Sequence, residues 1–186
     1  MSATDDRVTR TATRSFALFD TALGTCGIVW GERGIVGVHL PESTSAAARA
    51  RLRRRFPDAR EAPPPPEVCH AIDGVITLLR GEPSDLADVA LDMSAVPEFH
   101  RRVYEVARTI PRGATLTYGE LASRVGAPGA ARAVGQALGQ NPFAPIVPCH
   151  RVLAAGGRLG GFSATGGVAT KLRLLSIEGG NGPLFD

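Results

Sequence analysis

The chain has 186 residues, of which 44% are hydrophobic, and this length and composition suit one large or two small folded domains. No stretch reaches the roughly 18 apolar residues of a membrane-spanning helix, which argues against a membrane protein, and the formal charge of +3 permits a phosphate-binding face without requiring one. Three cysteines, Cys26, Cys69 and Cys149, form an odd set without zinc-site spacing, so we expect a cytoplasmic protein with free thiols and no bound metal.

The first half of the chain alternates short apolar runs with glycine-rich turns. After a tail at residues 1–14, the pattern predicts strands and helices in this order: strands at 15–20, 27–30 and 35–40, a helix at 43–56, a helix at 68–79 and a last strand at 89–93. The prolines at 63–66 predict a rigid extended connector between the two helices. Together these elements predict an α/β N-terminal domain over residues 15–93, with helices on a small antiparallel sheet.

Most of the basic residues of the chain are arginines, and Lys171 is the only lysine. The densest group lies on the predicted helix at 43–56 and consists of Arg49, Arg51, Arg53, Arg54 and Arg55. A run of like charges on one helix is more typical of a solvated face than of a DNA site. We therefore expect this face to point into solvent.

Residues 94–180 predict a mainly α-helical C-terminal domain, which begins with a helix from Pro97 to Thr109. A short helix at 117–126 ends at Gly126, and Pro128 precedes a second helix at 130–138. Two short helices joined by a tight turn predict a helix-turn-helix. The second helix contains small residues and one arginine, Arg132, a composition that suits either close approach to another surface or tight packing inside the protein.

A short segment, from Pro148 to Val152, places Cys149 directly before His150. A cysteine attacks as the thiolate, and a neighbouring base raises the thiolate fraction. The ordinary alternative is a small buried cysteine beside a surface histidine. The segments on both sides favour the nucleophile over that alternative.

Downstream lies a glycine-dense loop at 156–167, followed by a helix at 168–177 with Val168, Leu172 and Leu175 at helical spacing. Glu178 stands at the end of this helix. A carboxylate there suits the orientation of His150 in a Cys-His-Glu relay, although a solvated helix-end residue is the simpler interpretation of Glu178 alone. Residues 181–186 predict a second tail.

These motifs share their order and spacing with a known family. Tyr118, the small-residue helix around Arg132, Asn141-Pro142, the Pro148–Val152 segment, Ser163 and Ile177-Glu178-Gly179 together resemble the O6-alkylguanine-DNA alkyltransferases, or methylated-DNA–protein-cysteine methyltransferases. The resemblance runs from about residue 97 to residue 179, and the first half matches only in general plan. It implies an RNase H-like N-terminal domain in front of the helix-turn-helix domain.

The resemblance also implies a reaction. A member of this family repairs DNA by irreversible, single-turnover transfer of an alkyl group, chiefly methyl, from O6 of guanine to Cys149, with O4 of thymine as a further substrate. The base is flipped out of double-stranded DNA, and the helix-turn-helix docks in the minor groove. The implied protein is a monomer without a cofactor, associated with the nucleoid when it is bound to DNA.

The family pattern assigns roles to individual residues. In the reaction, Cys149 is the nucleophile, His150 its base through a water, Glu178 the partner that fixes the histidine tautomer, and Tyr118 a proton donor to the leaving guanine. Arg132 takes the place of the extruded nucleotide, and its helix contacts DNA through Ala131, Ala133 and Gly135. The implied pocket residues are Val152, Leu159, Phe162 and Ser163, with Asn141 as a hinge and Arg151 as a structural brace.

Phe162 stands where many relatives have tyrosine, and residues 164–167 form a longer segment than in some members. Two other functions remain as alternatives. A non-catalytic alkyltransferase-like protein is disfavoured because such proteins replace the nucleophile, usually with tryptophan. A hydrolase that uses Cys149, His150 and Glu178 through an acyl-enzyme is disfavoured because adjacent Cys and His in one turn are unusual for that class.

Overall fold

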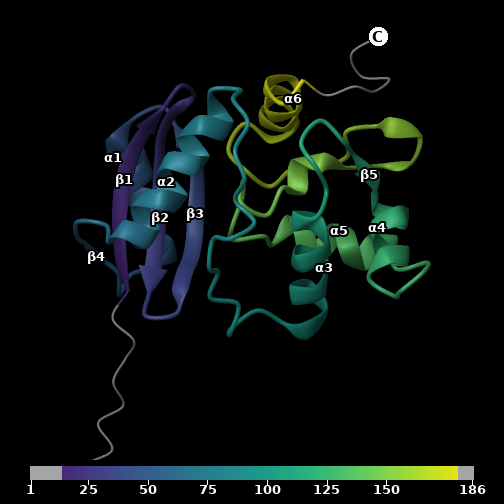
Figure 1. Ribbon diagram of the computed structural model, residues 1–186, viewed down its shortest axis with the longest axis horizontal. Helices are drawn as coiled ribbons and strands as arrows, with labels where there is room; N and C mark the ends of the chain where they lie inside the picture. The colour runs from purple at the N-terminus through teal and green to yellow at the C-terminus, as the bar shows by residue number, and fades with distance from the viewer. Residues whose placement is uncertain (1–13, 180–186) are drawn as a thin grey trace, which may run out of the picture.

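The computed structural model describes residues 14–179, which fold into a sheet with two helices and a mostly helical half beside it (Figure 1). The tails predicted for residues 1–14 and 181–186 lie outside this range, apart from Arg14. The α/β character predicted for the first half is confirmed, since three strands are followed there by helices.

The sheet contains β1 (Ser15–Thr21), β2 (Gly24–Gly31), β3 (Gly34–Glu42) and β4 (Arg60–Glu61) in the order β3-β2-β1-β4. The first three strands pair antiparallel, as predicted, but the short β4 pairs parallel with β1, so the sheet is mixed.

The strand predicted at 89–93 is wrong. Leu91 makes only an isolated bridge to Ile35, and the chain then turns away because the Asp92 carboxylate accepts a hydrogen bond from the Ser94 amide.

Alternate strand residues point to opposite faces of the sheet, and a helix covers each face. On one face, Phe16 and Val29 pack against Leu52 and Phe56 from the segment of α1 (Ser45–Arg55). On the other, Ala17 and Ile28 belong to the large core that also contains the buried side of α2 (Pro66–Leu79). That side repeats at helical spacing and consists of Val68, Ala71, Ile72, Val75, Leu78 and Leu79.

The arginines of α1 have three different environments. Arg53 and Arg54 are exposed, as predicted for a solvated face. Arg49 forms a bidentate ion pair with Glu61 at the sheet edge. Arg51 donates hydrogen bonds to Glu42 and to Thr165 of the distant glycine-rich loop, while its side chain remains 39% exposed.

The C-terminal half contains four helices and two short parallel strands within the described residues. They are α3 (Glu98–Arg108), β5 (Leu116–Thr117), α4 (Tyr118–Arg124), α5 (Ala131–Gly139), β6 (Val152–Leu153) and α6 (Gly167–Ile177). Local sequence determines where α4 begins and ends. Thr117 and Glu120 form a reciprocal capping box at its start, and Gly126, at a φ of 75°, closes its end in a conformation that favours glycine.

Of the three apolar residues expected at helical spacing on the last helix, only Leu175 is buried. α6 buries Lys171, Leu174 and Leu175, while Val168 and Leu172 are 43% and 38% exposed. The apolar pattern misled the prediction because the buried face carries a lysine, with Glu178 two turns further along and also buried. These two charged groups belong to the site described below.

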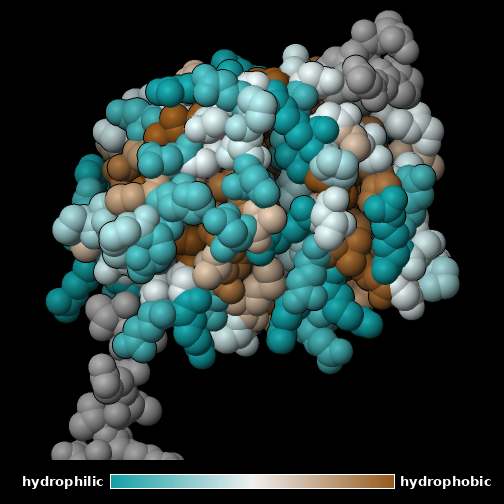
Figure 2. Space-filling model, in the orientation of Figure 1, coloured by the Kyte–Doolittle hydropathy of each residue, from teal (hydrophilic) through white to brown (hydrophobic). Residues whose placement is uncertain are grey.

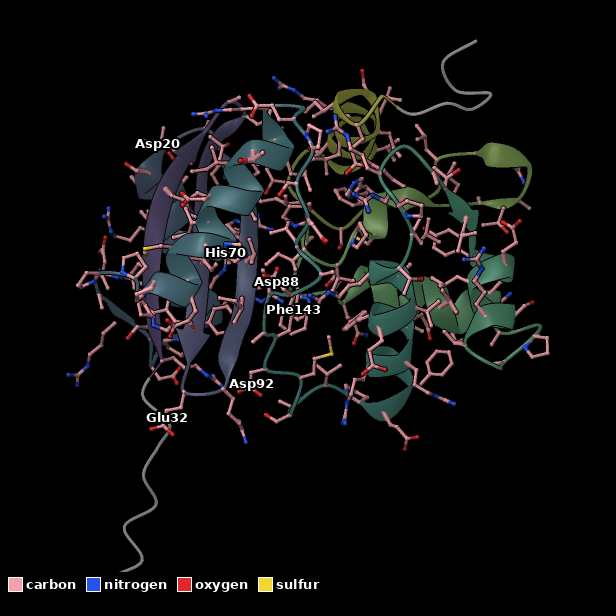
Figure 3. All side chains as sticks on the ribbon, in the orientation of Figure 1. Asp20, Glu32, His70, Asp88, Asp92 and Phe143 are labelled. Carbon is pink, nitrogen blue, oxygen red and sulfur yellow. The ribbon has the colours of Figure 1, made fainter. Side chains whose placement is uncertain are left out.

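Buried side chains and guanidinium groups join the two halves. Phe143 is fully buried between them (Figure 3), and its ring packs edge-on against Tyr104, whose hydroxyl donates to the Ala137 carbonyl. The Arg108 guanidinium donates to three carbonyls of the connector at 80–97, which links α2 to α3, namely those of Leu86, Ala87 and Val89. On the same connector, the Asp88 carboxylate faces His70 of α2 (Figure 3). The connector is therefore fixed to both halves.

On the face shown in Figure 2, hydrophilic side chains cover most of the surface, with hydrophobic residues between them over the helical half. Among residues 14–179, no helix has both the length and the apolar character that a bilayer crossing needs.

Candidate active site

Cys149 begins a single 3₁₀ turn, Cys149–Arg151, that leads directly into β6. Its backbone amide donates to the Val147 carbonyl over 2.8 Å. The Asn141 side chain stabilises the same segment through two hydrogen bonds of 2.9 Å. Its amide nitrogen donates to the Val147 carbonyl, and its oxygen accepts from the Phe143 amide. The structure thus places Asn141 between the end of α5 and the turn that carries the thiol.

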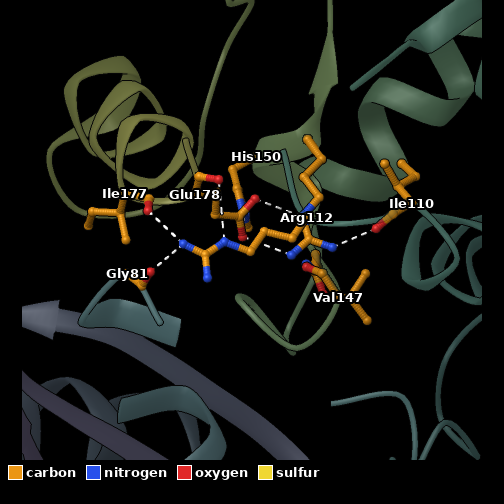
Figure 4. Close-up of polar contacts among 9 residues, drawn as sticks. Gly81, Ile110, Arg112, Val147, His150, Ile177 and Glu178 are labelled. Carbon is orange, nitrogen blue, oxygen red and sulfur yellow. Dashed lines mark hydrogen bonds and ion pairs between the residues drawn. The ribbon is translucent and has the colours of Figure 1, made fainter. Parts of the chain in front are cut away.

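His150 and Arg151 of this turn form a buried cluster with Glu178 (Figure 4). Nε2 of His150 lies 2.9 Å from Oε1 of Glu178, and Arg151 donates to both carboxylate oxygens, over 2.9 Å and 2.8 Å. Arg112 holds the end of α6 from outside, since it donates to the carbonyls of Ile177 and Glu178 and to that of Gly81 (Figure 4). Glu178 is therefore held in two ways: its carboxylate accepts hydrogen bonds from His150 and Arg151, and its backbone carbonyl accepts one from Arg112.

The cluster determines which nitrogen of His150 is basic. Burial raises the pKa of Glu178, but the hydrogen bonds from His150 and Arg151 outweigh it and lower that pKa to about 2, so the carboxylate is ionised and accepts. Burial lowers the pKa of His150 against the opposing effect of Glu178, which keeps the ring neutral. A neutral ring that donates from Nε2 has its lone pair on Nδ1. Within residues 14–179, Nδ1 of His150 is also the one buried side-chain nitrogen or oxygen without a hydrogen-bond partner.

Cys149 itself is 7% exposed. Burial raises the pKa of its thiol, while the Asn141 side chain and the charge of Lys171 act in the opposite direction. The resting group at neutral pH is therefore the thiol, which needs a base before it can attack.

Lys171 is a buried cation that sequence reasoning did not assign to the site. Its ammonium donates to the Val152 carbonyl over 2.6 Å and lies 5.6 Å from the centre of the Tyr118 ring. Burial lowers the pKa of Lys171 to about 8, with Cys149 acting in the opposite direction, so the ammonium still carries its charge at neutral pH. The available signal was its identity as the only lysine in a chain rich in arginine.

A cavity of about 550 Å³ opens above the thiol. This volume lies within the range of about 300–1,000 Å³ that is typical of small-molecule sites. The cavity runs between α5 and the glycine-rich loop, and its lining includes Cys149, Tyr118, Arg132, Phe162 and Ser163. Gly160 lies against the tyrosine, because a Cβ there would come 3.3 Å from the Tyr118 hydroxyl, and its φ of 66° favours glycine.

Seven of the fourteen predicted site residues line this cavity. Ala131, Arg132 and Gly135 of α5 line it, and Arg132 is exposed at that wall. Of the eight residues predicted to contact DNA or to form the pocket, three do not line it: Ala133, Val152 and Leu159. Val152 is fully buried, and its carbonyl accepts a hydrogen bond from the Lys171 ammonium.

Between residues 14 and 179, no group of three or more His, Cys, Asp or Glu side chains is placed so that it could hold a metal ion.

Comparisons with known proteins show the family to which the chain belongs. The family profile described as "6-O-methylguanine DNA methyltransferase, DNA binding domain" matches residues 98–180. A methylated-DNA–protein-cysteine methyltransferase of Methanothermobacter thermautotrophicus is 37% identical over 153 residues, which are 82% of this chain and 78% of that protein. The protein of the same name from Mycobacterium tuberculosis is 45% identical over 128 residues, which are 67% of this chain and 75% of that protein.

Solved structures extend the similarity to both halves of the chain. The structure of M. tuberculosis OGT in complex with DNA superposes with a TM-score of 0.71 at 35% identity, over 88% of this chain and 92% of that one. The O6-methylguanine-DNA methyltransferase of Pyrococcus kodakaraensis gives 0.67 at 26% identity, over 89% and 99%. By sequence identity and coverage, this chain belongs to the methylated-DNA–protein-cysteine methyltransferase family.

Proposed function

We propose that this protein repairs alkylated DNA by moving an alkyl group, chiefly methyl, from O6 of guanine to the sulfur of Cys149. The observation that carries the proposal is a thiol on a cavity wall whose neighbouring histidine is held by a carboxylate and keeps one buried ring nitrogen unpartnered. Family membership supplies the reaction class, and the site supplies the residues that perform it.

Deprotonation comes first. Because the pKa of Cys149 is raised, the thiol needs a base that removes its proton before attack. Nδ1 of the adjacent His150 carries a lone pair that can accept this proton. The proton passes to Nδ1 through a bridging water, and the ionised Glu178 stabilises the imidazolium that forms. The Lys171 ammonium stabilises the thiolate.

Methyl transfer is then an in-line displacement. A sulfur–carbon bond forms as the bond between carbon and guanine O6 breaks, and the electron pair moves onto the guanine. Burial raises the pKa of Tyr118, so its hydroxyl stays protonated and can donate to the guanine ring. The Ser163 amide, on the wall of the same cavity, donates to O6. The tyrosine then takes a proton from solvent and the His150 imidazolium releases one to solvent, so the proton lost by the thiol balances the proton gained by the guanine.

The base must leave the DNA helix to enter this cavity. We assign docking to α4 and α5 as a helix-turn-helix, with α5 in the minor groove, where the small Ala131, Ala133 and Gly135 permit close approach. Arg132 fills the space of the extruded nucleotide. M. tuberculosis OGT was solved in complex with DNA, which supports DNA as the partner.

The thioether product has no route back to the thiol within this site, so each molecule acts once. We further propose that the protein acts as a monomer, takes O4-alkylthymine as a second substrate, and has an RNase H-like first half. Its cytoplasmic location remains a prediction.

A stoichiometric titration tests the proposal. Increasing amounts of duplex DNA with one O6-methylguanine are added to a fixed amount of protein, and restored guanine is measured by cleavage with a methylation-sensitive restriction enzyme. Repair stops at one lesion per protein, and Cys149→Ser repairs none. A variant that repairs normally without Cys149, or repair that exceeds the amount of protein, contradicts the proposal. Binding without repair indicates a lesion-binding protein, and sustained turnover of an ester indicates a hydrolase.

A further inference from the structure

One polar cluster ties the glycine-rich loop of the active site to the sheet half of the molecule. Oε1 of Glu42, the last residue of β3, accepts from the Thr165 hydroxyl over 2.8 Å, from Arg51 over 3.2 Å and from Nε2 of His39 over 3.0 Å. Arg51 also donates to the Thr165 hydroxyl over 2.8 Å. Thr165 is therefore held from two elements of the other half, β3 and α1.

The acceptor of these hydrogen bonds is charged and largely removed from solvent, while Arg51 is partly exposed and Thr165 is exposed. The Glu42 side chain is 12% exposed. Burial raises the pKa of Glu42, but the hydrogen bonds from Thr165 and His39 and the charge of Arg51 outweigh it and lower that pKa, so the carboxylate is ionised at neutral pH. Hydrogen bonds to an ionised acceptor are roughly twice as strong as neutral ones.

The loop has few other polar anchors. In the part of the chain that the structure describes, the hydrogen bonds between residues 159–166 and the sheet half are those at Thr165. The Thr165 carbonyl also accepts from the Thr170 hydroxyl, which links the same residue to the first turn of α6. Thr165 is thus the point where the sheet half, the loop and α6 are joined.

Thr165 lies two residues after Ser163 and three after Phe162, which line the cavity with Cys149. A second, smaller cavity of about 60 Å³ touches Cys149, Phe162 and Ser163 on one side and His39 and Arg51 on the other. A free loop would have room to shift into this space, away from the substrate. Holding Thr165 prevents that shift.

We propose that Glu42, Arg51 and Thr165 are positioning residues for alkyl transfer: the sheet half holds the loop so that the Ser163 amide meets O6 of the flipped guanine. The inference rests on the proposed function of Cys149. A misplacement of about 1 Å costs about 100-fold in rate, and loss of one donor to a developing oxyanion costs about 100- to 1,000-fold. Loosening the loop without removing the donor should therefore slow transfer by about 10- to 100-fold.

Thr165→Val tests the inference, because it removes the hydroxyl at nearly constant volume. Thr165→Ser keeps the hydroxyl and is the conservative rescue. Arg49→Ala is the matched control, since Arg49 lies on the same helix but pairs with Glu61, away from the loop. For each protein we would measure four quantities: the rate constant of methyl transfer from O6-methylguanine DNA, the Kd for that DNA, the rate of Cys149 alkylation by iodoacetamide, and amide hydrogen exchange of residues 161–164.

The expected result is a pattern across these measurements. Thr165→Val loses about 10- to 100-fold in methyl transfer and exchanges its loop amides faster, while its Kd and its iodoacetamide rate do not worsen. Thr165→Ser and Arg49→Ala behave as the wild type. Methyl transfer by Thr165→Val at the wild-type rate overturns the inference, and so does an equal loss of iodoacetamide reactivity, which indicates general disruption of the site. A wild-type protein that transfers no methyl group instead refutes the proposed function.

Discussion

The buried carboxylate of Glu178 should contribute a large part of the stability of this protein. Its side chain is 1% exposed and is shared by His150 and Arg151. The folded structure lowers its pKa from 4.5 to about 2. Each pKa unit corresponds to about 1.4 kcal/mol, so folding stabilises the ionised form by about 3 kcal/mol. Removal of one partner from a buried ion pair typically lowers stability by about 3–5 kcal/mol, which agrees with the value obtained from the pKa shift.

Glu178→Gln keeps the shape of the side chain and removes the charge. At pH 7 we expect the free energy of unfolding to fall by about 3 kcal/mol, and the Tm to fall by about 6–12 °C for a chain of this size. Urea unfolding should be followed by the fluorescence of Trp30, the single tryptophan, and by circular dichroism, because Trp30 reports on the sheet half and circular dichroism on the helices.

The pH dependence of this effect has a defined sign. Because the folded pKa lies below the unfolded one, the Glu178 carboxylate stabilises the protein fully above about pH 4.5 and loses that contribution as the pH falls toward 2. The difference between wild type and Glu178→Gln should therefore shrink across this range. Glu61→Gln is the control, since its pair with Arg49 is solvent-exposed and its removal should leave the midpoint unchanged. A difference at pH 7 below about 1 kcal/mol, or one that grows in acid, refutes the reasoning.

Three further predictions concern the thiol and its surroundings. Lys171→Met removes the cation that lowers the pKa of Cys149, so the pH profile of iodoacetamide alkylation should shift to higher pH; an unchanged profile counts against a role for the ammonium. Asn141→Leu removes two hydrogen bonds at the turn and should cost about 2 kcal/mol in urea unfolding; full stability would show that the turn holds without it. Methylated protein should be less stable than unmodified protein by about 1–3 kcal/mol, because the added group overpacks the site; equal melting temperatures would contradict this.

The sequence predicted the parts of the fold that depend on local signals. Gly126 marks the end of α4, and short apolar runs between glycine-rich turns place β1, β2 and β3 within a few residues. The short β4 was missed because its two residues are charged and exposed. The predicted apolar residues of α6 gave only part of the buried face, because a lysine is not expected to be buried. Burial of Lys171 is explained by its contacts with the Val152 carbonyl and the Tyr118 ring.

The site shows the same division between local and distant signals. The segment around Cys149 and His150 is contiguous, so its motif could be recognised directly. The Glu42 cluster could not be predicted, because Arg51 and Thr165 are more than a hundred positions apart and nothing in either neighbourhood indicates the other. Likewise, Val152 was expected to line the cavity, but it is buried and its carbonyl accepts a hydrogen bond from Lys171.

The central claim is that the sulfur of Cys149 becomes the permanent acceptor of the alkyl group. The most direct test is mass spectrometry of the protein after incubation with O6-methylguanine duplex under reducing conditions, with peptide sequencing to locate the change. The account predicts that each molecule gains one methyl group in place of one hydrogen, on Cys149, with Cys26 and Cys69 unmodified and no gain in Cys149→Ser. An unmodified Cys149 after the lesion has been repaired, or a methyl group on another residue, would contradict it.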